Sequence, residues 1–113
     1  MATINIYEQY FEAKMKYNGV DRKGALVMLI ADSEAGNIKY EAAVSFFPHR
    51  DEEDYAISYD AYFSKVLFEE KGRRSKKRDA EYLDSIKKHI DEIAKEAGGE
   101  VFWDKPLREA RYE

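Results

Sequence analysis

The dipeptide Asn18-Gly19 constrains the fold of this chain more than any other local feature. Asn-Gly readily supplies the positive backbone φ angles of a type I′ turn, the tight connection between two adjacent antiparallel strands. Residues 4–17, which precede the turn, alternate apolar and charged side chains as a half-buried strand does. They also place Tyr7 and Phe11 at helical spacing, so a helix is the alternative for this segment. The turn favours the strand.

The chain after this turn contains further strand patterns. Residues 25–31 are apolar on both faces, which indicates a central strand covered on both sides. Residues 33–37 supply turn-forming side chains, and residues 38–46 then alternate again. Residues 59–70 fit either a strand or a helical stripe, and the strand is favoured as far as residue 63.

A long helix is predicted over residues 79–97. Its apolar side chains recur at spacings of three and four residues, which places them in one narrow seam: Leu83, Ile86, Ile90, Ile93 and Ala97. Asp79 is positioned to cap the N-terminus of this helix, and Gly98-Gly99 is positioned to end it. Residues 100–103 follow as a short final strand.

These patterns together predict a fold class. A chain of 113 residues is long enough for one hydrophobic core and short for two. We expect a single α+β domain over residues 1–113, in which residues 104–113 either pack or form a loose tail. Its antiparallel sheet is a meander of about four or five strands, and the long helix 79–97 packs on one face of that sheet.

Composition narrows the classes of function. Hydrophobic residues make up 44 % and charged residues 37 %, which is typical of a soluble folded protein and excludes wholesale disorder. The absence of cysteine excludes a disulfide scaffold, a thiolate metal site and a cysteine nucleophile. No secretory signal or bilayer-length apolar stretch is visible, so we expect a cytoplasmic location. A net charge of −4 argues against a protein that coats nucleic acid.

Positive charge nevertheless gathers directly before the predicted helix, at Arg73, Arg74, Lys76, Lys77 and Arg78. A helix N-terminus disfavours cations by about 0.3–1 kcal/mol per charge, so stability alone does not explain this cluster. A bound phosphate or carboxylate would explain it, since backbone N–H groups and guanidinium groups would converge on the anion. The alternative is a solvated loop whose cations pair with nearby acids: Glu69, Glu70, Asp79 and Glu81.

The run Gly72-Arg-Arg-Ser-Lys-Lys77 resembles the end of a double-stranded RNA-binding domain, where Gly-x-x-Ser-Lys-Lys opens a helix. The resemblance implies contacts between its lysines and RNA phosphates, and a helix over residues 4–17 would complete the element order of that family. The chain departs from the family pattern elsewhere. Residues 33–37 lack the expected Gly-Pro-x-His element, and residues 47–75 are too long. We assign no family on a match of six residues.

A second candidate surface combines acids and tyrosines. The acids Asp51, Glu52, Glu53 and Asp54 form a loop, and Tyr55, Tyr59 and Tyr62 follow in or beside strands. Tyrosine suits binding interfaces, although a small sheet also uses aromatic side chains for cross-strand pairs. The spacing of the acids does not match a calcium-binding loop, so we expect no metal site.

The sequence lacks a recognisable catalytic motif. His49 could act as a general base oriented by Asp51 or Asp54, yet no nucleophile motif or phosphate-binding loop accompanies it. His89 lies at the edge of the apolar seam, and we expect it to be a partly buried structural residue. We therefore expect no enzymatic activity and no cofactor.

These observations favour a small intracellular binding module. It would contact an anionic partner, such as nucleic acid, a nucleotide or an acidic protein surface, through residues 73–78. The alternative is a protein–protein interaction factor or inhibitor, of the kind encoded by phages and mobile elements, that uses residues 51–54 and the tyrosine-rich sheet. We expect no membrane contact, and a homo-oligomer could form through a strand edge or through the helix 79–97.

Overall fold

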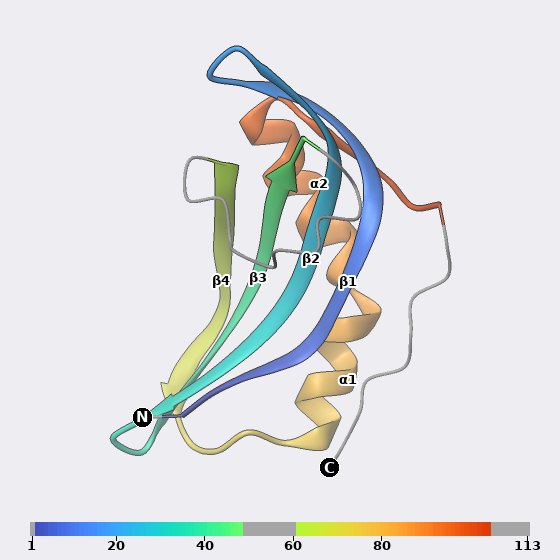
Figure 1. The fold of residues 1–113 in the computed structure, drawn as a ribbon. Coiled ribbons are helices and arrows are strands. Elements are labelled where there is room, and N and C mark those ends of the chain that lie inside the picture. Colours follow the sequence, from blue (N-terminus) through green and yellow to red (C-terminus); the bar gives the residue numbers. More distant parts are fainter. Residues whose placement is uncertain (1, 49–60, 105–113) are drawn as a thin grey trace.

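The computed structural model describes residues 2–48 and 61–104. The elements are β1 (Ala2–Tyr17), β2 (Val20–Glu34), β3 (Asn37–Phe47), β4 (Tyr62–Lys71), α1 (Lys76–Asp84), α2 (Ile86–Ala97) and β5 (Glu100–Phe102). All five strands belong to one antiparallel sheet in the order β4-β3-β2-β1-β5. The long strands curve, and both helices lie on the same face, which we name the helix side (Figure 1). The α+β class and the meander of β1 to β4 are confirmed.

The predicted turn at Asn18-Gly19 joins β1 to β2. Both turn residues have positive φ angles, 52° and 75°, as a type I′ turn requires. The two strands pair from this turn to the start of the chain, where Ala2 lies opposite Ser33. Residues 4–17 are therefore a strand, and the helical alternative for this segment is wrong. The helix-first element order of a double-stranded RNA-binding domain is accordingly absent.

A second tight turn joins β2 to β3 inside the predicted turn segment 33–37. Ala35 and Gly36 occupy it with φ angles of 52° and 82°. The strands run right up to this pair, because Glu34 lies opposite Asn37. The left-handed conformation costs an alanine about 1–2 kcal/mol, so Ala35 is an unusual residue at a turn position that glycine or asparagine normally occupies.

The central strand β2 is covered on both faces, as its apolar run predicts. Its side chains enter two layers, because successive residues of a strand point to opposite faces. On the helix side, Val27 and Leu29 pack into the main core with large side chains from the sheet and helices, including Phe11, Tyr40, Phe46, Ile86 and Ile90. On the outer face, Leu26 and Met28 form a smaller cluster with Ala43 and Phe47.

The prediction of a single long helix over residues 79–97 is wrong in two respects. The structure has two helices, α1 and α2, separated at Ser85. The Ser85 hydroxyl donates to the carbonyl oxygens of Glu81 and Tyr82, a back-bonding pattern that often bends helices and slightly destabilises them. The first helix also begins three residues earlier than expected, because Ser75 and not Asp79 is its N-cap. The apolar seam remains, and it is carried mainly by α2.

The sheet ends in two different edges. At one edge, β5 pairs with the middle of β1, which confirms the predicted short final strand. At the other edge lies β4, which continues as a strand to Lys71, beyond residue 63. Leu67 has no partner on β3, because Phe68 lies opposite Tyr40 and Val66 lies opposite Glu41. This bulge is a common feature of edge strands.

Neither α1 nor α2 is long and apolar enough to cross a membrane.

Candidate functional site

The predicted anion-binding residues lie in a short loop and the first turn of α1. This loop follows the edge strand β4. The backbone N–H of Gly72 donates a hydrogen bond of 3.0 Å to the carbonyl oxygen of Gly36, which connects the loop to the turn between β2 and β3. Gly72 has a φ of 139°, a conformation that side chains rarely adopt. Ser75 then caps α1, since its hydroxyl oxygen accepts the backbone N–H of Arg78 at 3.1 Å.

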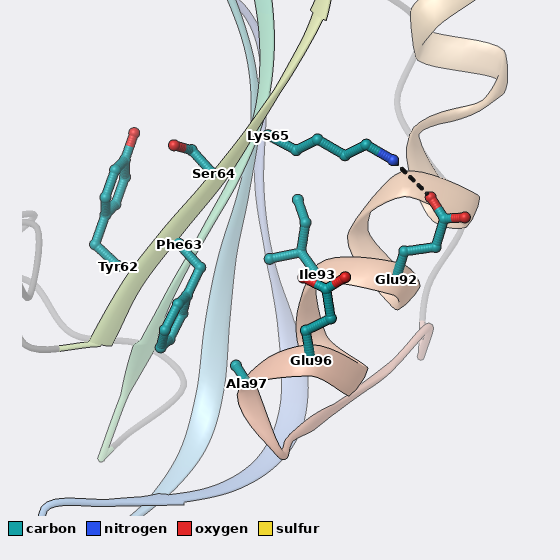
Figure 2. Close-up of a pocket in the computed structure, with 8 residues that line it drawn as sticks. All are labelled: Tyr62, Phe63, Ser64, Lys65, Glu92, Ile93, Glu96 and Ala97. Carbon is teal, nitrogen blue, oxygen red and sulfur yellow. Dashed lines mark hydrogen bonds and ion pairs between the residues drawn. The ribbon is translucent and has the colours of Figure 1, made fainter.

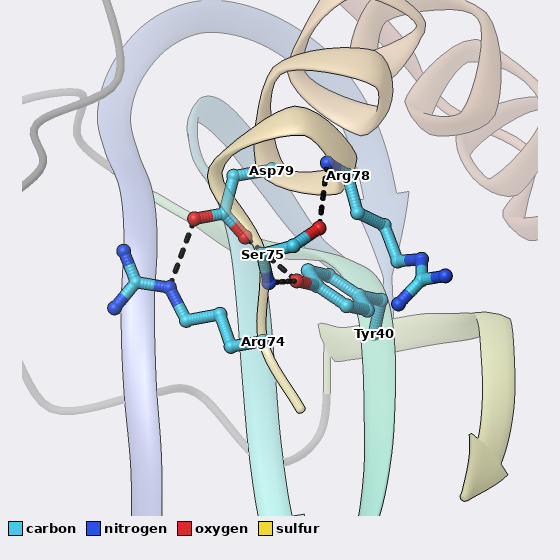
Figure 3. A network of polar contacts seen from close by, with 5 residues as sticks. All are labelled: Tyr40, Arg74, Ser75, Arg78 and Asp79. Carbon is cyan, nitrogen blue, oxygen red and sulfur yellow. Dashed lines mark hydrogen bonds and ion pairs between the residues drawn. The ribbon is translucent and has the colours of Figure 1, made fainter. Parts of the chain in front are cut away.

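A buried carboxylate connects this loop to the sheet. The side chain of Asp79 is fully buried. It accepts a hydrogen bond of 2.7 Å from the Tyr40 hydroxyl and one of 2.8 Å from Nε of Arg74. The Tyr40 hydroxyl accepts in turn from the backbone N–H of Ser75 at 3.2 Å (Figure 3). We name these four residues the Asp79 network. It joins β3, the loop and α1 in one closed set of polar contacts.

The Asp79 network already supplies an anion to the N-terminus of α1. A carboxylate in the first turn complements the helix dipole, and the Arg74 guanidinium offsets the cost of burying its charge. Arg78 also turns inward, because its guanidinium carbon lies 4.2 Å from the ring centroid of Phe68. Two of the five predicted ligands therefore hold the loop against the sheet.

The remaining cations point to solvent. Arg73, Lys76 and Lys77 are all exposed. Arg73 and Lys77 make no hydrogen bond or ion pair within residues 2–48 and 61–104. We name Arg73, Lys76 and Lys77 the basic face. The structure thus divides the five predicted residues into a structural pair and an exposed group of three.

Sequence reasoning missed the role of Tyr40 and misread that of Asp79. The two residues are 39 positions apart, and no local pattern connects them. One sequence signal does distinguish Asp79: a carboxylate four residues after a serine suits the first turn of a helix capped by that serine.

Burial of Tyr40 predicts a loss of stability at alkaline pH. Burial and the hydrogen bond to Asp79 raise the pKa of the Tyr40 phenol from 10.0 to about 12. Since the folded state favours the protonated phenol, its contribution to stability is complete below pH 10 and is lost as the pH rises from 10 to about 12. Chemical denaturation across this range should show that Tyr40→Phe has a flatter profile than the wild type. Parallel profiles would contradict this assignment.

The second candidate surface is described only in part. Asp51, Glu52, Glu53, Asp54, Tyr55 and Tyr59 lie outside the described residues, as does His49. Tyr62 is half-buried on the outer face of the sheet, in one cross-strand row with Tyr10, Leu26 and Ser45. Burial raises the pKa of the Tyr62 phenol, and the Glu41 carboxylate adds to this effect.

His89 is partly buried, as the apolar seam predicts. Its side chain is 20 % exposed, and Nδ1 lies 3.7 Å from Oε1 of Glu92. Burial lowers the pKa of the His89 imidazole, and the charge of Lys65 lowers it further. Among residues 2–48 and 61–104, no three histidine, aspartate or glutamate side chains come together as a metal site would require.

Comparison with known proteins adds no relative from which a function could be transferred. No protein-family model, curated protein or solved structure matches this chain. The functional argument therefore rests on the geometry of the basic face and on the surfaces around it.

Proposed function

We propose that the chain is a non-enzymatic binding module that contacts an anionic partner through the basic face. One observation carries this proposal: Arg74 and Arg78 make internal contacts that fix the loop, whereas Arg73 and Lys77 are exposed and have no counter-ion among the described residues. A loop already held in place loses little conformational entropy when it binds. Two or three cations held at one end of the sheet can then act on the same anionic surface.

The number of exposed cations sets the expected salt dependence. Each phosphate neutralised on a nucleic-acid duplex contributes about −0.9 to the slope of log K against log salt concentration. Two or three contacts therefore predict that affinity falls by about 10- to 40-fold between about 50 and 200 mM salt. A protein with five ligating cations would lose considerably more.

Fluorescence anisotropy tests the proposal with four labelled probes: an RNA duplex of about 20 base pairs, its DNA equivalent, a single strand and an oligoglutamate peptide. We expect saturable, salt-sensitive binding of at least one probe and its loss in the double variant Arg73→Ala/Lys77→Ala. The matched control is Lys88→Ala/Lys95→Ala, which removes two exposed cations from α2. The proposal is wrong if no probe binds at low salt, or if both double variants weaken binding equally.

A protein–protein interaction factor is the second candidate. It is favoured by the row of side chains on the outer face, where Tyr10 and Tyr62 flank Leu26 and Ser45. Tyrosines beside an apolar strip provide contact area with polar tips, which suits a protein interface. A stoichiometric protein complex that Tyr62→Ala abolishes, and that Arg73→Ala/Lys77→Ala leaves intact, would support this candidate over the first.

A cytoplasmic location suits both candidates, since a chain without cysteine needs no oxidising compartment.

A further inference from the structure

A groove separates the edge strand β4 from α2. It has a volume of about 680 Å³, and its lining comes from the first half of the strand and the second half of the helix: Tyr62, Phe63, Ser64, Lys65, Glu92, Ile93, Glu96 and Ala97. Phe63 and Lys65 extend from β4 toward α2, whereas Tyr62 and Ser64 point to the other side of the strand (Figure 2). The basic face follows the opposite end of β4, so the groove is a separate surface.

One wall of the groove is a strand edge. Among residues 2–48 and 61–104, β4 is the last strand of the sheet, and it pairs with β3 on its inner side. Alternate residues of an edge strand direct their N–H and C=O groups away from the sheet. No backbone hydrogen bond reaches the outer edge of Tyr62–Val66 from the rest of the described chain. An extended peptide can add to such an edge by main-chain pairing.

The floor of the groove is apolar and fixed by the core. The Phe63 ring makes edge-to-face contacts with Tyr17 and Phe46, at centroid distances of 5.8 and 6.2 Å. Ile93 is 6 % exposed, and Ala97 is half-buried. A floor anchored in this way is formed before any ligand arrives, as is usual for binding sites.

The charges around the floor favour a cation. Lys65 and Glu92 neutralise each other through an ion pair of 3.1 Å. Glu96 is exposed, and the described part of the chain holds no hydrogen bond or ion pair to its carboxylate. It lies one residue before the end of α2, where the helix dipole also favours positive charge. An arginine or lysine beside Phe63 could lay its aliphatic stem on the apolar floor and direct its charged end to Glu96.

We propose that this groove is a docking site for an extended segment of another protein, which adds to the edge of β4 and places a basic side chain between Phe63 and Glu96. Main-chain pairing with β4 provides the affinity, and the apolar floor with Glu96 selects the side chain. Residues on either side of the basic one lie on the outer face of the sheet, the face that carries Tyr62, Ser64 and the 48 % exposed Val66 of the same strand. Apolar or β-branched residues suit these flanking positions.

The test uses labelled peptides of about nine residues, in which threonine and valine alternate around a central arginine. A second peptide has glutamate at the centre, and a third keeps the arginine but replaces two threonines with proline, which removes main-chain donors. We expect the arginine peptide to bind most tightly in anisotropy titrations and the proline peptide not to bind. Backbone amide signals of Tyr62–Val66 and of residues 92–97 should shift on titration in NMR spectra.

Charge reversal distinguishes this site from general attraction to an acidic protein. Glu96→Lys should weaken the arginine peptide about tenfold and strengthen the glutamate peptide, a reversal that misfolding cannot produce. The matched control is Glu81→Lys, an exposed glutamate on α1, which should change either affinity by less than about twofold. The inference is overturned if both variants act alike, if the proline peptide binds as well as its parent, or if sedimentation shows that a second copy of this chain occupies β4. The basic face plays no part in the test.

Discussion

Replacing Asp79 with alanine should lower the free energy of unfolding by about 3 kcal/mol, because breaking a buried ion pair leaves its partners without compensation. The carboxylate is fully buried and receives hydrogen bonds from Tyr40 and Arg74. Its loss leaves the Tyr40 hydroxyl as a donor without an acceptor and removes the contact that fixes α1 to β3. Urea denaturation followed by circular dichroism measures the change.

Two further variants distinguish the effect of breaking the Asp79 network from the effect of removing a negative charge from α1. Tyr40→Phe removes one hydroxyl from the same network and should cost about 1–2 kcal/mol. Asp84→Ala removes an exposed acid from the C-terminal end of the same helix, where the dipole disfavours negative charge, and should change stability by less than about 0.5 kcal/mol. A cost for Asp79→Ala no larger than that for Asp84→Ala would contradict the structural role of the Asp79 network.

Phe11→Ala should have an effect of similar or larger size. The Phe11 ring is fully buried on the helix side of β1 and forms a T-shaped pair with the Trp103 ring at a centroid distance of 4.8 Å. Removal of a buried phenylalanine ring costs about 3–5 kcal/mol, since it leaves a cavity as well as less buried apolar area. Trp103 is the only tryptophan of the chain, so its fluorescence reports on this contact directly. We expect a red shift of the emission of the folded protein together with the lower stability.

The matched control is Phe102→Ala on β5. It removes the same ring from the residue next to Trp103, but the Phe102 side chain is 39 % exposed. We expect a smaller cost than for Phe11→Ala and an unchanged emission maximum, because the Phe102 side chain is partly in contact with solvent and leaves no enclosed cavity. Equal effects of the two substitutions would show that the fluorescence of Trp103 does not depend on its contact with Phe11.

Much of the fold could be predicted because local chemistry determines it. Asn18-Gly19 fixes a two-residue turn, and the turn fixes the pairing of β1 with β2. The apolar run 25–31 predicts a strand covered on both faces, and the seam of α2 predicts a helix packed on a sheet. The break at Ser85 escaped prediction, because it depends on a hydroxyl that bonds to backbone carbonyls within one turn.

The candidate site was predictable as a location but not as a set of contacts. The charge run shows where cations gather, and the structure then assigns Arg74 and Arg78 to contacts with other side chains of the fold. That assignment depends on Tyr40 and Phe68, which reach the loop only through the pairing of β3 with β4. Contacts of this kind depend on strand register, which a local sequence pattern does not determine.

The division of the helical segment at Ser85 has a consequence for how the protein opens. α2 buries four side chains, of which three are isoleucines, whereas the only fully buried side chain of α1 within the described structure is the charged Asp79. Apolar burial resists local unfolding, and α1, whose apolar contacts with the core come from the partly buried Tyr82 and Leu83, forms a weaker cooperative unit than α2. Amide hydrogens of α1 should therefore exchange with solvent through subglobal openings while those of α2 exchange only with the whole domain. The basic face would then lie on the part of the molecule that unfolds first.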